Sequence, residues 1–123
     1  MTTFNGSCHC GEVQFEIRNQ SQLENLKRCD CSLCRKKGAV MATARLEDLV
    51  VTQGEERLSL YQWNTKTAKH YFCSKCGIYT HHQRRVAPDE FGFNVACIEG
   101  VDMESLQNAP MTDGQSLSLV DDP

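Results

Sequence analysis

Hydrophobic and polar side chains alternate most clearly across residues 12–18, where Val13, Phe15 and Ile17 occupy every second position. A two-residue period places these three side chains on one face of a strand, so the segment predicts a strand buried on one side. Six further segments carry the short hydrophobic runs typical of strands. They are residues 39–44, 49–52, 57–62, 68–72, 78–82 and 92–96.

Turn-forming residues separate several of these predicted strands, at Gly38, at 53–54, at 63–64 and at 88–89. Helical periodicity is nearly absent, and only residues 103–107 predict a single helical turn. Many short strands joined by turns favour an antiparallel all-β domain. We expect one domain over residues 1–110, followed by a polar C-terminal tail over 111–123.

The composition narrows the function classes. The chain has 123 residues, the length of one ordinary domain, and a formal charge of −3. An acidic balance argues against binding to a nucleic-acid backbone, which depends on positive charge. No apolar run reaches the roughly 18 residues that a membrane span needs, and the N-terminus lacks the pattern of a secretory signal. We therefore expect a cytoplasmic protein.

Cysteine is the residue type that changes this picture. The chain contains eight cysteines, and seven of them form three tight clusters. These clusters are Cys8 and Cys10, then Cys29, Cys31 and Cys34, then Cys73 and Cys76. A disulfide framework usually spreads its cysteines to join separate loops, whereas thiolates one or two residues apart can converge on one ion. We therefore predict metal binding, with zinc favoured over iron or an iron–sulfur cluster.

Seven clustered thiolates fit two partitions. In the first, Cys8 and Cys10 join Cys73 and Cys76 in a closed four-thiolate site, and the middle cluster holds a second ion with an open coordination position. In the second, the last two cysteines of the middle cluster pair with Cys73 and Cys76 as a zinc ribbon. We favour the first, because the ribbon leaves three clustered thiols unused. Gly77 would then supply the left-handed backbone of a tight turn after Cys76.

The clusters and their flanking residues carry a family resemblance. The segments are Gly6-Ser-Cys-His-Cys-Gly11, Cys29-Asp-Cys-Ser-Leu-Cys-Arg-Lys-Lys-Gly-Ala39 and His70-Tyr-Phe-Cys-Ser-Lys-Cys-Gly77. Together they resemble the glutathione-dependent formaldehyde-activating enzyme family, which also includes centromere protein V. Three linked motifs make the resemblance specific, and it covers residues 4–102.

The resemblance implies a β-tent fold of antiparallel sheets and two zinc ions per chain. It implies that Cys8, Cys10, Cys73 and Cys76 form the structural zinc site. It also implies that Cys29, Cys31 and Cys34 form an open, catalytic one. The implied activity is that of a carbon–sulfur lyase that acts on a small thiol adduct made from glutathione and formaldehyde. The alternative is a non-catalytic, zinc-stabilised binding module.

Residues 80–85, Thr-His-His-Gln-Arg-Arg, carry further polar side chains. They could bring an imidazole and a guanidinium toward the carboxylates of a glutathione-like ligand. We favour a solvated edge strand, whose charges discourage pairing with another chain. Lys36 and Lys37 flank the middle cluster and could attract an anionic substrate, although a charged loop is the simpler interpretation.

The remaining singled-out residues have ordinary structural interpretations. His9 lies between two predicted ligands, so its side chain should point away from their ion. His70 is expected within a strand. Cys97 is the eighth cysteine, and we favour a core position for it over ligation of the second ion.

Overall fold

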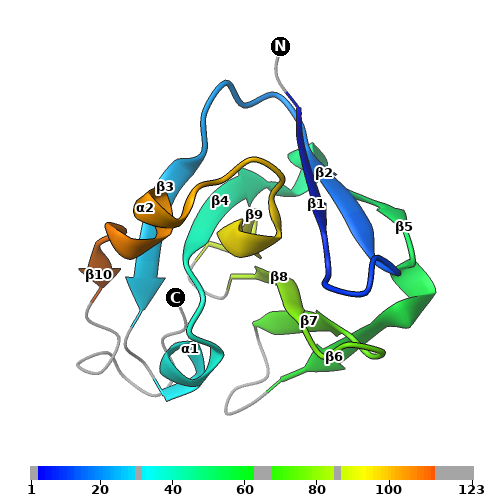
Figure 1. Ribbon diagram of the computed structural model, residues 1–123. Coiled ribbons are helices and arrows are strands. Elements are labelled where there is room, and N and C mark those ends of the chain that lie inside the picture. Colours follow the sequence, from blue (N-terminus) through cyan, green and yellow to red (C-terminus); the bar gives the residue numbers. More distant parts are fainter. Residues whose placement is uncertain (1–2, 30–31, 63–67, 85–86, 113–123) are drawn as a thin grey trace.

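The computed structural model describes residues 3–29, 32–62, 68–84 and 87–112, which form two β-sheets (Figure 1). The smaller sheet has three antiparallel strands in the order β1-β2-β5. Its strands are β1 (Phe4–Ser7), β2 (Gln14–Ile17) and β5 (Leu49–Gln53).

The larger sheet has seven strands in the order β10-β3-β4-β9-β8-β7-β6. All neighbours are antiparallel except β10 and β3, which are parallel. The strands are β3 (Glu24–Cys29), β4 (Met41–Arg45), β6 (Leu58–Tyr61), β7 (Lys69–Cys73), β8 (Tyr79–Gln83), β9 (Glu90–Asn94) and β10 (Met111–Thr112).

Helices are short wherever the chain is described. The two α-helices are α1 (Ser32–Lys37) and α2 (Met103–Gln107). Single 3-10 turns occur at η1 (Leu46–Asp48), η2 (Glu55–Arg57) and η3 (Val95–Cys97). Among the described residues, no helix is long and apolar enough to cross a membrane.

The main core is built from both sheets. Phe15 and Ile17 of β2 pack in one buried cluster with Ala42 of β4 and Phe93 of β9. All four side chains are essentially inaccessible to water. Burying a phenylalanine or isoleucine side chain stabilises a fold by roughly 1.5–3 kcal/mol. This shared core therefore holds the two sheets together and fixes the turns at their ends.

Most strand predictions are confirmed. The alternating segment 12–18 contains β2, and the five segments between residues 39 and 82 coincide with β4 to β8 within a few residues. The last predicted strand, 92–96, is displaced toward the C-terminus by about two residues relative to β9. The helical turn at 103–107 matches α2. The domain is all-β and mostly antiparallel, as the sequence predicts.

Two elements near the middle cysteine cluster carry no recognisable pattern. Strand β3 contains Asn25 with a φ of 58°, and its pairing with β4 shifts register between Glu24 and Lys27. Such a bulge destroys the alternation on which strand prediction depends. Helix α1 lacks an apolar stripe, but three basic residues in its last turn complement the helix dipole. Gly38 follows with a φ of 65°, as helix C-termini prefer.

The interpretation of residues 80–85 as a solvated edge strand is wrong. Strand β8 lies between β7 and β9 in the larger sheet, so both of its edges are paired. Thr80, His81 and His82 are all buried. Aromatic partners and hydrogen bonds replace the water that these polar side chains lose.

Candidate metal centre

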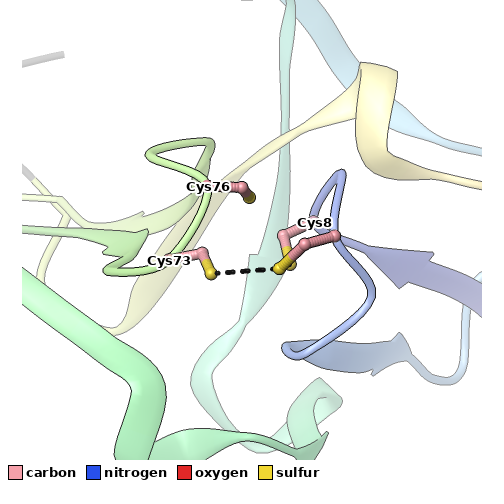
Figure 2. A group of neighbouring side chains, drawn as sticks. Cys8, Cys73 and Cys76 are labelled. Atoms are coloured by element: carbon pink, nitrogen blue, oxygen red, sulfur yellow. Dashed lines mark hydrogen bonds between the residues drawn. The ribbon is translucent and has the colours of Figure 1, made fainter.

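Two turns from different sheets bring four cysteines together. Cys8 follows β1 of the smaller sheet, and Cys73 ends β7 of the larger one. Figure 2 shows the side chains of Cys8, Cys73 and Cys76 directed toward one another across the junction of these turns. With Cys10, their four sulfur atoms all lie within 4.8 Å of one another.

The spacing of the sulfur atoms fits a tetrahedral ion. The Cys8 and Cys10 sulfurs are 3.6 Å apart, and those of Cys10 and Cys73 are 3.7 Å apart. Four zinc–sulfur bonds of about 2.3 Å in tetrahedral geometry place neighbouring sulfurs about 3.8 Å apart. The grouping is the one that the first partition predicts, since Cys73 and Cys76 gather with Cys8 and Cys10.

Both turns have the same backbone plan. The amide of Cys8 donates to the carbonyl of Val13 at 3.0 Å, and the amide of Cys73 donates to the carbonyl of Ile78 at 3.0 Å. Each turn has a glycine directly after its second cysteine, and Gly77 has a φ of 79°, in the left-handed region that the sequence predicts. The left-handed backbone reverses the chain within a few residues, so that two thiols of each turn face the same point.

Two of the four thiols have pKa values that depart in opposite directions from that of an ordinary cysteine. Burial acts to raise the pKa of Cys76, but backbone hydrogen bonds from Cys10 and Ile78 outweigh it and lower that pKa to about 6. For Cys10, a backbone hydrogen bond from Glu12 acts to lower the pKa, while desolvation and the adjoining thiols raise it to about 11. One thiol is thus poised to ionise, and neighbouring thiols resist further negative charge until a cation compensates it.

The middle cluster lies between a strand and a helix. Cys29 ends β3, and Cys34 lies in α1. Cys31 falls outside the described residues, as do the side chains of Cys29 and Cys34. The open zinc site that the sequence predicts at these three cysteines therefore remains a prediction.

A buried polar cluster adjoins α1. The Lys37 ammonium donates to Nδ1 of His70 at 2.9 Å and lies 3.7 Å from the centre of the Tyr79 ring. The Tyr79 hydroxyl and Nδ1 of His82 are 2.6 Å apart, and the His70 and His82 rings stack at 5.0 Å. Both histidines are 2% exposed. We refer to Lys37, His70, Tyr79 and His82 as the histidine–tyrosine cluster.

Sequence reasoning missed this cluster because it treated β8 as an exposed edge and Lys37 as part of a loop. Lys37 instead ends α1, and it is half-buried, whereas Lys36 is exposed. The sequence did contain a signal for the cluster, because two short segments rich in histidine and tyrosine recur in it, His70-Tyr71 and His81-His82. Two such segments flank the same Cys-x-x-Cys turn, and an antiparallel hairpin must bring them together.

Cys97 and His9 both lie outside the four-sulfur cluster. The Cys97 thiol donates to the carbonyl of Tyr79 at 3.7 Å and packs against the main core. Burial raises the pKa of Cys97 to about 12, with nearby Cys8 and Cys76 adding to the effect. The thiol is therefore neutral, which supports the core interpretation. His9 is exposed between Cys8 and Cys10.

A model of the glutathione-dependent formaldehyde-activating enzyme family matches residues 3–112. The chain belongs to this family. All seven clustered cysteines fall inside the matched range, and so does the histidine–tyrosine cluster.

The chain is similar to a curated protein and to a solved structure. A Halomonas elongata protein, provisionally described as a glutathione-dependent formaldehyde-activating enzyme, is 35% identical over 79 residues. That match covers 58% of this chain and 50% of the relative, so the chain spans about half the length of that curated relative. A crystal structure of a Rhodobacter sphaeroides protein, solved as a structural genomics target, is 55% identical with a TM-score of 0.82. It covers 88% of this chain and 99% of its own.

Family membership and the four-sulfur geometry support the same coarse conclusion. The family takes its name from a glutathione-dependent reaction of formaldehyde. The four-cysteine cluster can hold a metal ion.

Proposed function

We propose that the chain is a zinc-dependent carbon–sulfur lyase-type enzyme that joins glutathione to formaldehyde, giving S-hydroxymethylglutathione. The observation that carries the proposal is the family match over residues 3–112, which contains all three cysteine clusters. The proposed domain covers residues 1–110, with 111–123 as its C-terminal tail, although the first two residues of that tail pair with β3 as strand β10. Open thiolates require a reducing compartment, so the proposal places the chain in the cytoplasm.

The closed site has a structural role in this proposal. Cys8, Cys10, Cys73 and Cys76 supply four thiolates, which satisfy a tetrahedral zinc ion completely. Because the four sulfurs come from turns of different sheets, the ion would join β1–β2 to β7–β8. No coordination position remains for a substrate, so chemistry belongs elsewhere.

The reaction is assigned to the middle cluster. Cys29, Cys31 and Cys34 lie within six positions of the chain, so three thiolates can reach one ion and leave its fourth position open. A zinc ion held there favours the thiolate form of an incoming thiol. The addition breaks the thiol S–H bond, forms the S–C bond and transfers a proton to the carbonyl oxygen. The cysteines contribute ligand geometry, and the substrate contributes the reacting sulfur.

Exchange spectroscopy by NMR tests this assignment, because formaldehyde and glutathione also combine without a catalyst. We expect the wild-type chain to accelerate exchange between free glutathione and its hydroxymethyl adduct well above the spontaneous rate. Cys31→Ser should abolish that acceleration while it retains one zinc ion per chain and a near-wild-type Tm. An undiminished exchange rate in a folded Cys31→Ser variant would remove the middle cluster from the mechanism.

A further inference from the structure

A cationic cavity lies where β3, α1 and α2 approach one another. It has a volume of about 410 Å³. Its polar lining comes from Arg28, Lys37, Asn94 and Gln107, and the described residues that line it include no acidic side chain. We call it the Arg28–Lys37 cavity. Figure 1 shows β3 with α1 near one end and α2 beside it.

Contacts outside the cavity fix its two cations in position. The Arg28 guanidinium donates from Nε and Nη2 to the carbonyl of Ala109, at 3.3 and 3.1 Å. Lys37 is held between His70 and the ring of Tyr79. Tyr79 is fixed in turn, since its carbonyl accepts from Nδ2 of Asn94 at 2.9 Å. Cations held in this way lose little side-chain entropy when an anion arrives.

The charge of the surrounding chain favours an anion. The segment between Lys27 and Lys37 contains five basic residues and one acidic residue, giving it a formal charge of +4 within a chain of −3. A local positive field in an acidic protein attracts anions to one place and raises their encounter rate. The cavity therefore fits a carboxylate better than a neutral or cationic group.

The cavity is also linked to the middle cysteine cluster along the chain. Arg28 directly precedes Cys29, and Lys37 follows Cys34 by three residues in α1. Three residues of helix rise about 4.5 Å. In an extended tripeptide, a carboxylate one residue beyond the cysteine lies about 7 Å from the thiol. A peptide thiol could thus place its carboxylate in the cavity and its sulfur at the cluster.

We propose that the Arg28–Lys37 cavity binds the glycyl carboxylate of glutathione and so positions the thiol at the Cys29, Cys31 and Cys34 cluster. This inference rests on the proposed function for its substrate. The cavity itself is a binding site, and its occupancy can be measured without turnover. Arg28 and Lys37 act as positioning residues.

NMR titration with S-methylglutathione, which has no thiol proton to lose, tests the site on the full chain. We expect Lys37→Met to weaken binding at least tenfold. Lys36→Met is the matched control, because it removes the same charge from an exposed neighbouring position. It should change the Kd by less than twofold. Equal losses of affinity in Lys37→Met and Lys36→Met would mean that binding depends on overall charge and not on the cavity. That result would overturn the proposal.

The glycine ester of S-methylglutathione supplies a second arm that needs no variant. The ester should bind the wild-type chain about as weakly as the free acid binds Lys37→Met. The affinity of the ester for Lys37→Met should be little lower than either of these. Such non-additivity identifies the carboxylate as the partner of Lys37. Equal binding of acid and ester would overturn the proposal. Arg28→Gln, which should also weaken the acid but not the ester, replaces Lys37→Met if that variant does not fold.

Two further measurements separate the possible outcomes. Competition by inorganic phosphate or acetate at the same concentrations as S-methylglutathione would mean a general anion site, which contradicts the assignment to glutathione. Exchange catalysis with glutathione should have a raised KM in Lys37→Met and the wild-type KM in Lys36→Met. Carboxylate-dependent binding without any catalysis would contradict the proposed function alone. Catalysis with an unchanged KM for glutathione in both Lys37→Met and Arg28→Gln would contradict the cavity alone.

Discussion

Gly54 shows how a single residue fixes the first cysteine turn. Its φ is 80°, and a Cβ atom placed on it would lie 1.9 Å from the backbone carbonyl oxygen of Glu12. Glu12 belongs to the turn that carries Cys8 and Cys10. The backbone contact is therefore possible only because residue 54 has no side chain.

Gly54→Ala should destabilise the fold more than a left-handed alanine alone does. Gly100→Ala is the matched control, because Gly100 has a φ of 84° but open space around the added methyl group. Left-handed backbone costs an L-residue about 1–2 kcal/mol. We expect urea unfolding to give a loss at least about 2 kcal/mol larger for Gly54→Ala than for Gly100→Ala. Equal losses would mean that the Glu12 backbone moves aside freely.

His81 links stability to pH. Its ring stacks on Tyr71 at 4.8 Å and meets the edge of Phe91 at 5.3 Å. Burial lowers the pKa of His81 to about 4, against 6.5 for an ordinary histidine. The unfolded chain thus takes up a proton at a higher pH than the native chain does. The contribution of His81 to stability is complete above pH 6.5 and is lost as the pH falls toward 4.

His81→Gln should flatten that dependence. Between pH 7 and pH 5 we expect the wild type to lose about 2 kcal/mol of unfolding free energy through His81, and the variant to lack that component. Urea unfolding of zinc-loaded protein at both pH values measures the difference. His9→Gln, at an exposed position, is the control for loss of a histidine. Parallel pH curves for wild type and His81→Gln would contradict a buried neutral imidazole.

At the level of elements, the two cysteine turns form a matched pair. Cys10 is exposed, so its replacement removes a sulfur ligand without emptying the core. We expect Cys10→Ser to lower the zinc content by one ion per chain and to lower the Tm. Cys97→Ala, which alters a thiol outside the four-sulfur cluster, should keep the full zinc content. Plasma mass spectrometry on both variants decides the point, and an unchanged zinc content in Cys10→Ser would exclude Cys10 as a ligand.

Local sequence patterns predict elements where one face is buried and the other is wet. Val13, Phe15 and Ile17 satisfy that condition, and β2 is found where their alternation predicts it. The burial of residues in the middle strands of the larger sheet is harder to predict from the sequence. In β8 the buried residues include two histidines and a threonine, whose polarity suggested exposure although each is enclosed by its neighbours. Hydrophobic patterning cannot detect burial that depends on partners from other strands.

The candidate site was predictable to different extents. The spacing of Cys73 and Cys76 with Gly77 specifies a tight turn, because thiol separation and left-handed backbone are local properties. Which cysteine pair meets that turn depends on tertiary structure, and spacing alone left two partitions open. The histidine–tyrosine cluster depends wholly on strand register and on the position of α1. Only the folded chain places Lys37 against His70.

For the whole molecule, a bound ion at the four-cysteine site would stabilise both sheets together. A structural zinc ion contributes its binding free energy to folding, and that contribution falls as acid protonates the thiolates. We expect removal of zinc by a chelator at pH 7 to lower the Tm by more than about 10 °C. The same chelator should scarcely change the Tm of Cys10→Ser, which already lacks the ion. A wild-type Tm that is insensitive to chelation would mean that the core alone holds the sheets.

The two halves of the four-sulfur cluster are far apart along the chain, because Cys73 follows Cys10 by 63 positions. During synthesis the N-terminal thiols therefore leave the ribosome long before their partners exist. For that interval they are exposed to oxidation and to capture by other metals, and the two sheets lack the link that the metal would supply. Completion of the cluster must wait for Cys76, so the final metal-bound fold is a late event in the life of each new chain. A truncated product that ends before this turn would carry reactive thiols with no native partner.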